Sequence, residues 1–328
     1  MENRIDPRPN RHAFTLIELL VVIAVVAVLS AVLLPALASA RGLARQTQGL
    51  SNLRQMAIGW RTYSIDHDMV LIAGRFAKEP GGTTNPDNHY MLDNGLKYRP
   101  RWIATLGLYQ GVSAFDNPST AEDRQDYTSD FFVCPTRPER TDERNSSYGY
   151  NLQFLGNARK THGQYHNYPV LQVRIGKPDH TVMAADSMGT AAGAPDANRT
   201  PYDNNGNAMT DLGNHGWSLD PPRLTPNSDR GSGDPGSLRT AVEPRHSGGR
   251  ANTVFGDGHA KPMTPTELGY RTDDTGAFVN GTPDAHIHDP AEPTNKYFSG
   301  DARNTDPPPP PPPPPPAKTP PKETPGAP

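Results

Sequence analysis

A single carboxylate, Glu18, lies near the start of an apolar run that extends from Phe14 to Leu34. Ionisable side chains are costly in hydrocarbon, and inside a membrane-length segment they usually mark function rather than packing. A buried carboxylate has to find a positive partner or take up a proton. Near the membrane interface, a glutamate can instead extend its head into the lipid headgroups. Glu18 is therefore a candidate functional residue at one end of a membrane segment.

A second set of side chains that could take part in chemistry lies within the segment RHSGGRANTVFGDGHAK (245–261). It consists of His246, Asp257 and His259. Two imidazoles and a carboxylate can hold a metal ion or move protons. Such a set is easily obtained by chance near a turn, and no nucleophile or glutamate base lies beside it. We therefore predict a structural hairpin with a His–Asp hydrogen bond, and we assign it neither catalysis nor a metal ion.

A β-hairpin is the element that must position this second group. Residues 253–255 are a short β-type run, and Asp257-Gly258 is a strong hairpin-turn signal. Residues 259–261 would then return as the partner strand. Two other segments have the pattern of strands, namely a short run within FFVCPTRP (131–138) and a buried strand within HTVMAADS (180–187).

Cys134 is the only cysteine, so no intramolecular disulfide can form. A reactive thiol needs a neighbour that stabilises the thiolate, and the nearest cation along the chain is Arg137. We interpret Cys134, which precedes Pro135, as a small buried apolar residue.

The composition divides the 328-residue chain into unlike parts. The net charge of −3 gives no reason to expect a nucleic-acid partner. Only 34% of the residues are hydrophobic, and many of these lie in the first 60 positions. Thirty glycines and 37 prolines indicate that the remainder is rich in loops and turns.

The apolar run predicts a membrane helix. Residues 14–34 are long enough to cross a hydrocarbon core of about 30 Å, whereas the apolar region of a signal peptide is shorter. Ala36-Leu37-Ala38 resembles a signal-peptidase site, so a cleaved secretory signal stays an alternative. Positive charges do not orient the helix, because arginines flank it on both sides: Arg4, Arg8, Arg11, Arg41, Arg45 and Arg54.

The helical pattern continues beyond the apolar run. Residues 35–65 carry an amphipathic pattern, with polar residues on the other faces. Its apolar stripe consists of Leu43, Leu50, Leu53, Ala57 and Trp60. We predict one helix from Phe14 to about Ile65, kinked near Pro35, whose second half packs its apolar stripe on a globular head.

The segment Phe14-Thr15-Leu16-Ile17-Glu18, preceded by a short polar leader (1–13), resembles the cleavage and methylation signature of type IV pilins and type II secretion pseudopilins. The resemblance implies that a membrane prepilin peptidase cuts between Ala13 and Phe14 and methylates the new amino group of Phe14. One departure is Ala13, because the family prefers glycine at this position. The resemblance also implies that Glu18 meets the N-terminal amine of a neighbouring subunit.

The same resemblance implies partners and a location. The partners would be the prepilin peptidase, other pilin-like subunits and an assembly platform in the inner membrane. The leader would lie in the cytoplasm and the head outside it.

Pro35 stands where many family members carry a kinking proline. The chain also resembles a signature near the end of large prepilin-like proteins, in which nine residues separate a histidine from Asp-Gly; here ten separate His246 from Asp257.

Two segments outside the helix are dominated by polar residues or proline. The excursion 188–240 is rich in Gly, Asn, Asp and Pro, and its DNNGN (203–207) lacks the glutamate of an EF-hand, since Asn214 stands there. Calcium in the head stays an open alternative, because some pseudopilins bind it.

The tail 306–328 contains ten consecutive prolines, which would form either a polyproline II spacer or ligand of about 30 Å or a disordered tail.

The sequence thus predicts an α+β, pilin-like protein: leader 1–13, membrane segment 14–34, amphipathic segment 35–65, an extracytoplasmic head of antiparallel β-sheet at 66–305, and a Pro-rich tail. The expected function is assembly into a pseudopilus or pilus, without enzyme activity and without a cofactor. Two alternatives are a membrane-tethered binding protein that does not polymerise and a secreted hydrolase with an ordinary signal peptide.

Overall fold

The computed structural model describes residues 16–76, 78–121, 124–161, 164–168, 170–224, 240–280 and 293–305. The chain divides into two compact units, residues 1–44 and 45–328. The predicted leader with Ala13 and Phe14, the tail 306–328 and part of the predicted excursion (225–239) lie outside the described residues.

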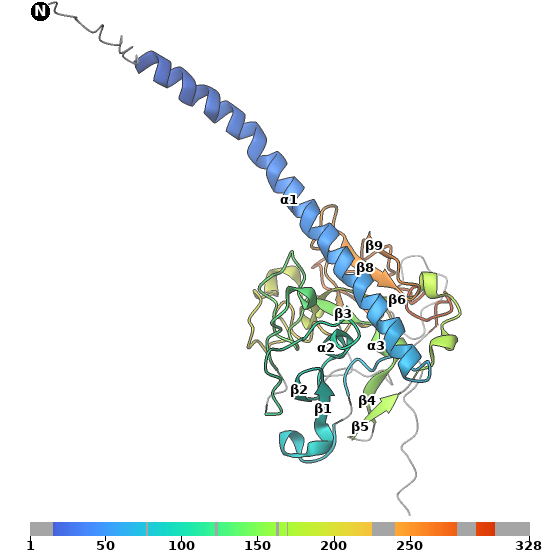
Figure 1. Cartoon of the computed structure of the whole chain (residues 1–328). Coiled ribbons are helices and arrows are strands. Elements are labelled where there is room, and N and C mark those ends of the chain that lie inside the picture. The colour runs from blue at the N-terminus through green and yellow to red at the C-terminus, as the bar shows by residue number, and fades with distance from the viewer. Residues whose placement is uncertain are drawn as a thin grey trace, which may run out of the picture. The chain divides into compact units, whose positions relative to one another are not determined.

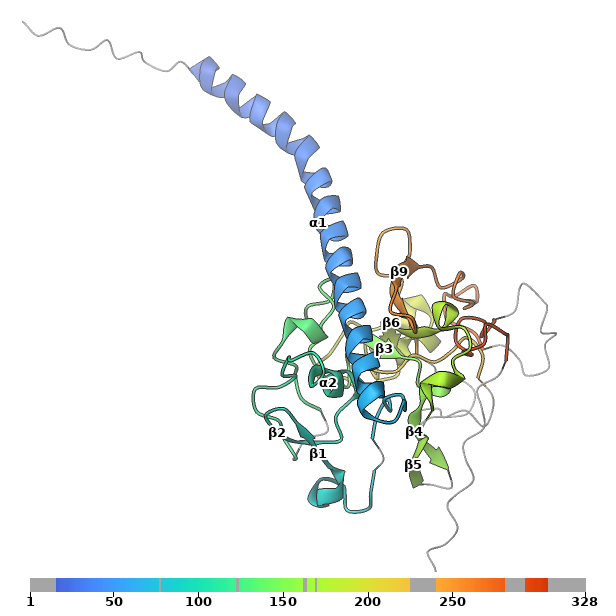
Figure 2. The ribbon, with the colours of Figure 1, turned by 45° about the vertical axis from the view of Figure 1, so that its right-hand side comes forward.

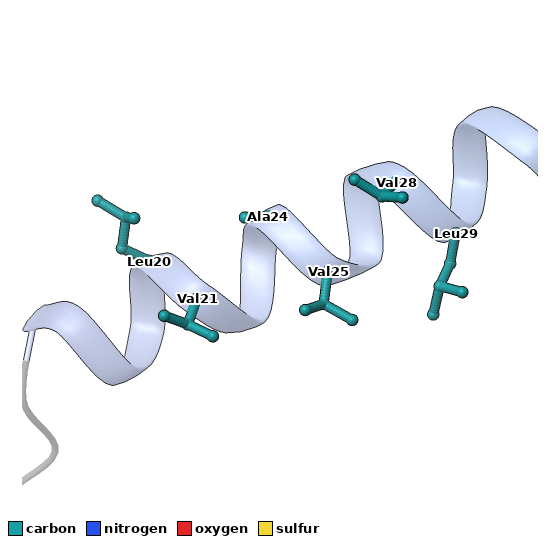
Figure 3. A pocket seen from close by; sticks show the side chains of 6 residues that line it. All are labelled: Leu20, Val21, Ala24, Val25, Val28 and Leu29. Atoms are coloured by element: carbon teal, nitrogen blue, oxygen red, sulfur yellow. The ribbon is translucent and has the colours of Figure 1, made fainter.

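The first unit contains the apolar part of helix α1 (Leu16–Asp66). This part is long and apolar enough to cross a bilayer, as the sequence predicts, and its side chains are exposed. Figure 3 shows six of them in two rows with i, i+4 spacing: Leu20, Ala24 and Val28 in one row, and Val21, Val25 and Leu29 in the other. The helix continues through Pro35 without interruption, so the predicted kink there stays a prediction.

The second half of α1 belongs to the second unit and packs on it along one face (Figures 1 and 2). Leu53, Ala57 and Trp60 are at most 1% exposed, which confirms the central part of the predicted stripe. Leu43 is 64% exposed and does not belong to it. The buried face of the helix instead begins at Gln46 and Gly49. The helix comes close to the sheet there because Gly49 has no side chain and because the main-chain oxygen of Gln46 accepts a hydrogen bond from Asn252.

The main sheet of the head is antiparallel and follows the order β3-β6-β8-β9, with a short strand β7 paired to β6. These strands are β3 (Tyr148–Tyr150), β6 (Val182–Gly189), β7 (Ala241–Val242), β8 (Ala251–Phe255) and β9 (Ala260–Met263). Every residue of β6 is buried, as expected for a central strand with partners on both sides, which confirms the strand predicted within 180–187. Together with α1, this sheet confirms the α+β class.

Strands β8 and β9 form the hairpin that the sequence predicts. Val254 pairs with Ala260 and Thr253 with Lys261, and Gly258 in the turn has a φ of 94°, which favours glycine. Strand β9 is outermost in the order of the sheet, and its carbonyl groups are partly occupied: Arg54 of α1 donates to the Ala260 oxygen and Arg250 to the Pro262 oxygen.

Smaller elements complete the described part of the head. They comprise the hairpins β1 (His89–Leu92) with β2 (Gly95–Tyr98) and β4 (Asn157–Thr161) with β5 (Gln164–Tyr168), and the short helices α2 (Trp102–Gly107) and α3 (Leu152–Leu155). Seven 3-10 turns lie at Gly82–Thr84, Pro86–Asn88, Asp130–Phe132, Gln172–Arg174, Pro178–His180, Thr190–Gly193 and Asp196–Asn198.

One strand prediction was wrong. The β-type run expected within 131–138 is replaced by the 3-10 turn Asp130–Phe132. The hydroxyl of Ser129 accepts a hydrogen bond from the Phe131 N–H and so favours the turn over an extended strand.

Candidate functional site

Glu18 lies in the first turn of α1, which begins at Leu16 among the described residues. A carboxylate at this end of a helix is favoured by the helix dipole, because the unpaired N–H groups there carry partial positive charge. The predicted cleavage residues Ala13 and Phe14 lie outside the described residues, so the relation of Glu18 to the future amine stays a prediction.

His246, Asp257 and His259, which the sequence places in one segment, do not form one site in the structure. Asp257 accepts hydrogen bonds from the His259 N–H (3.0 Å) and contacts the His259 ring at 2.6 Å, and both side chains are partly exposed. His246 is buried and bonds through Nε2 to Asp186, at 2.8 Å. The two histidines separate because His246 precedes β8 while Asp257 follows it, and a five-residue strand is about 17 Å long.

Asp186, which the sequence analysis missed, is the centre of a buried cluster. It lies within β6 and is 0% exposed. Its Oδ2 accepts hydrogen bonds from the Asn252 main-chain N–H (2.7 Å) and contacts His246, and the guanidinium of Arg245 lies 3.4 Å from Oδ1. A carboxylate inside an otherwise apolar strand was the available signal, since such a charge has to be paired when it is buried.

Cys134 lies in the same cluster. Its Sγ, a carboxylate oxygen of Asp186 and a ring nitrogen of His246 all lie within 4.8 Å of one another. Burial, reinforced by the nearby Asp186 charge, raises the pKa of Cys134 to about 11. The thiol is therefore protonated at neutral pH and is inaccessible to solvent, which agrees with the prediction of a buried residue and speaks against a nucleophile.

A second buried carboxylate, Glu243, lies beside this cluster. It bonds to Arg137 and Arg140, and Arg245 lies 3.6 Å away. Burial by itself raises the pKa of Glu243, but the three guanidinium groups outweigh burial and lower this pKa to about 2. Glu243 therefore stays ionised and offsets the charge of the buried arginines.

The Asp186 cluster is connected to α1 through Asn252. The main-chain N–H of Asn252 binds Asp186, and its side-chain amide donates to the main-chain oxygen of Gln46 at 3.1 Å. His246, Asp186 and Asn252 thus form a hydrogen-bonded chain that ends on the helix.

In the described part of the predicted excursion, backbone oxygens converge on one amide. The Nδ2 group of Asn145 donates to the carbonyl oxygens of Asp203, Asn204 and Gly206, at 3.0–3.4 Å. These are oxygens of the kind that a calcium ion prefers, but the amide of Asn145 satisfies them here.

Comparison with known families identifies the N-terminal segment. Residues 8–34 match the family model described as the prokaryotic N-terminal methylation motif. Neither the curated proteins nor the solved structures gave a match to the chain. The chain therefore carries a prepilin-type processing signal, and this signal together with the exposed apolar helix fits a membrane-anchored, pilin-like protein.

Proposed function

We propose that the protein is a pilin-like structural subunit of a type II secretion pseudopilus or a type IV-like pilus. A prepilin peptidase would cut between Ala13 and Phe14 and methylate Phe14. The mature subunit would wait in the inner membrane, with its head outside the cytoplasm, until the assembly platform extracts it. The observation that carries this proposal is the methylation motif at residues 8–34, which overlaps the apolar half of a 51-residue helix.

The chemistry of assembly would rest on Glu18. Cleavage creates a positively charged amine on Phe14, so processing supplies the partner that a carboxylate in an apolar setting requires. In the membrane, a monomer can keep Glu18 protonated or at the headgroups. Between packed helices, the low dielectric strengthens an ion pair and makes a lone charge costly. The role is structural and requires neither enzyme activity nor a cofactor.

The test is the substitution Glu18→Ala in the full-length protein. The variant should insert into the membrane and be cleaved like the parent, but it should fail to crosslink to neighbouring subunits or to appear in sheared filaments. Glu18→Asp should be partly impaired, because its charge lies about one methylene closer to the backbone. Glu267→Ala, which removes an exposed carboxylate from the head, is the matched control and should behave like the parent.

Two outcomes would overturn the proposal in different ways. If Glu18→Ala crosslinks and fractionates like the parent, Glu18 is an interfacial residue and the membrane-tethered binding protein is favoured. If the intact mass of the mature chain corresponds to a start after Ala38 or Ala40, the segment is an ordinary signal peptide and the secreted alternative is favoured.

A further inference from the structure

Three side chains with metal-binding atoms meet at strand β6 of the main sheet, although they lie far apart in the sequence. Cys134 lies just after the turn Asp130–Phe132, Asp186 lies in β6, and His246 precedes β8. Their ligand atoms lie within 4.8 Å of one another, and the three residues are 0%, 0% and 7% exposed. We propose that Cys134, Asp186 and His246 form a structural site for a divalent transition metal of the zinc class.

The spacing suits a tetrahedral ion. Bonds of about 2.0–2.3 Å from zinc to nitrogen, oxygen and sulfur place the ligand atoms roughly 3.3–3.8 Å apart. The three atoms here need shifts of about 1 Å or less to reach that spacing. The Tyr148 hydroxyl, which is fully buried, lies beside the Cys134 thiol.

Two of the three ligands are anionic when a metal is bound. On binding, the metal replaces the thiol proton of Cys134, which passes to bulk water, so that a thiolate and the Asp186 carboxylate give the ligand set two negative charges. Asp186 also lies beside the cation Arg245, and Arg245 has further partners: its Nη2 donates to the Ser147 oxygen at 2.7 Å and lies 3.6 Å from Glu243. Asp186 can therefore turn one oxygen to the metal while its Oδ2 keeps the Asn252 N–H.

The ligand types select the class of metal. Sulfur and imidazole suit zinc and similar transition metals, whereas calcium and magnesium require oxygen ligands. The three side chains are buried, so the site lacks access for a substrate and its effect is to cross-link three segments of the head. One of these segments leads through Asn252 to α1, so that a bound metal would also stiffen the attachment of the helix.

The experiment uses the full-length protein in detergent, freed of metal and then titrated with Zn²⁺ and, separately, with Co²⁺. The parent should bind one equivalent of Zn²⁺, and its Co²⁺ form should show the charge-transfer absorption of a thiolate ligand. Cys134→Ser and His246→Gln should bind Zn²⁺ at least about tenfold more weakly. His259→Gln, which removes the exposed histidine of the β8–β9 hairpin, is the matched control and should bind like the parent.

The Co²⁺ spectrum of the parent protects the test against variants that fail to fold, because it reports the thiolate directly. A parent that binds no Zn²⁺, or a Co²⁺ spectrum without thiolate absorption, would overturn the proposal and leave the cluster as a hydrogen-bonded network. The same conclusion would follow if a folded Cys134→Ser variant bound Zn²⁺ as tightly as the parent.

Discussion

The side-chain amide of Asn252 donates a hydrogen bond of 3.1 Å to the main-chain oxygen of Gln46 and so fastens β8 to α1. This contact requires the helix to come close to the sheet, and Gly49 permits that approach. A Cβ atom on Gly49 would lie 2.9 Å from Nδ2 of Asn252 and 3.7 Å from the Tyr148 hydroxyl. The junction between helix and head therefore depends on a missing side chain as much as on a hydrogen bond.

Gly49→Ala should destabilise the head, because the new methyl group displaces the Asn252 amide or the helix. We expect the free energy of unfolding to fall by about 1–3 kcal/mol, the usual cost of overpacking. Chemical denaturation followed by tryptophan fluorescence measures this change, since Trp60 is buried under the same helix face. Gly42→Ala is the control: a Cβ there meets no atom within 4 Å, and alanine favours the helix. Equal stability of the two variants would refute the close contact.

Glu243→Gln should be strongly destabilising. The substitution removes the charge that offsets the buried guanidinium groups of Arg140 and Arg245, and breaking a buried pair in this way costs about 3–5 kcal/mol. Because the pKa of Glu243 is lowered to about 2, its contribution is present above the unfolded-state pKa and is lost as the pH falls from about 4.5 towards 2. Denaturation midpoints from pH 2 to 7 measure both effects. Glu139→Gln, at an exposed position, should change neither.

Asp142→Asn should have the opposite dependence on pH. Burial raises the pKa of Asp142 to about 7, so the folded protein holds a proton that the unfolded chain releases near pH 4. The folded state is therefore penalised as the pH rises from about 4 to 7, and asparagine avoids this penalty. Relative to the parent, the variant should gain roughly 2–4 kcal/mol between pH 4 and 8. Thermal unfolding at several pH values tests this, with the exposed Asp116→Asn as control. A gain that is constant across pH would contradict the buried carboxylate.

Ala13→Gly should accelerate processing. Residues 14–18 resemble a signature in which glycine is preferred immediately before the cleavage site. Glycine is smaller than alanine and should therefore fit the peptidase better. Intact-mass analysis over time after synthesis should show earlier loss of residues 1–13, with the added methyl group on Phe14 in both proteins. Ala13→Val, a larger side chain, should slow the reaction. Identical rates for all three would show that size at this position does not limit cleavage.

Helices, hairpins and strands that depend on residues close together in the sequence could be predicted. The apolar run gave α1, the turn Asp257-Gly258 gave the β8–β9 hairpin, and the aliphatic stretch before Asp186 gave β6. The Asp186 cluster could not be predicted in this way, because its members join residues 52 and 60 positions apart along the chain: Cys134 to Asp186, and Asp186 to His246. Within three positions of Cys134 the only charged residue is Arg137, whereas folding brings Asp186 and Arg245 beside the thiol. The residues after Ser129 favour a β-strand by type, but the Ser129 hydroxyl accepts a hydrogen bond from the Phe131 N–H and favours a turn instead.

The outer strand β9 has a consequence for how copies of the protein behave when they are crowded. Pro262 has no N–H to offer, and the carbonyl groups of Ala260 and Pro262 already accept hydrogen bonds from arginine side chains. An incoming strand would find almost nothing to pair with along this border, which is a common protection against edge-to-edge aggregation. Heads brought to high local concentration on a membrane can therefore touch along β9 without joining their sheets at this edge.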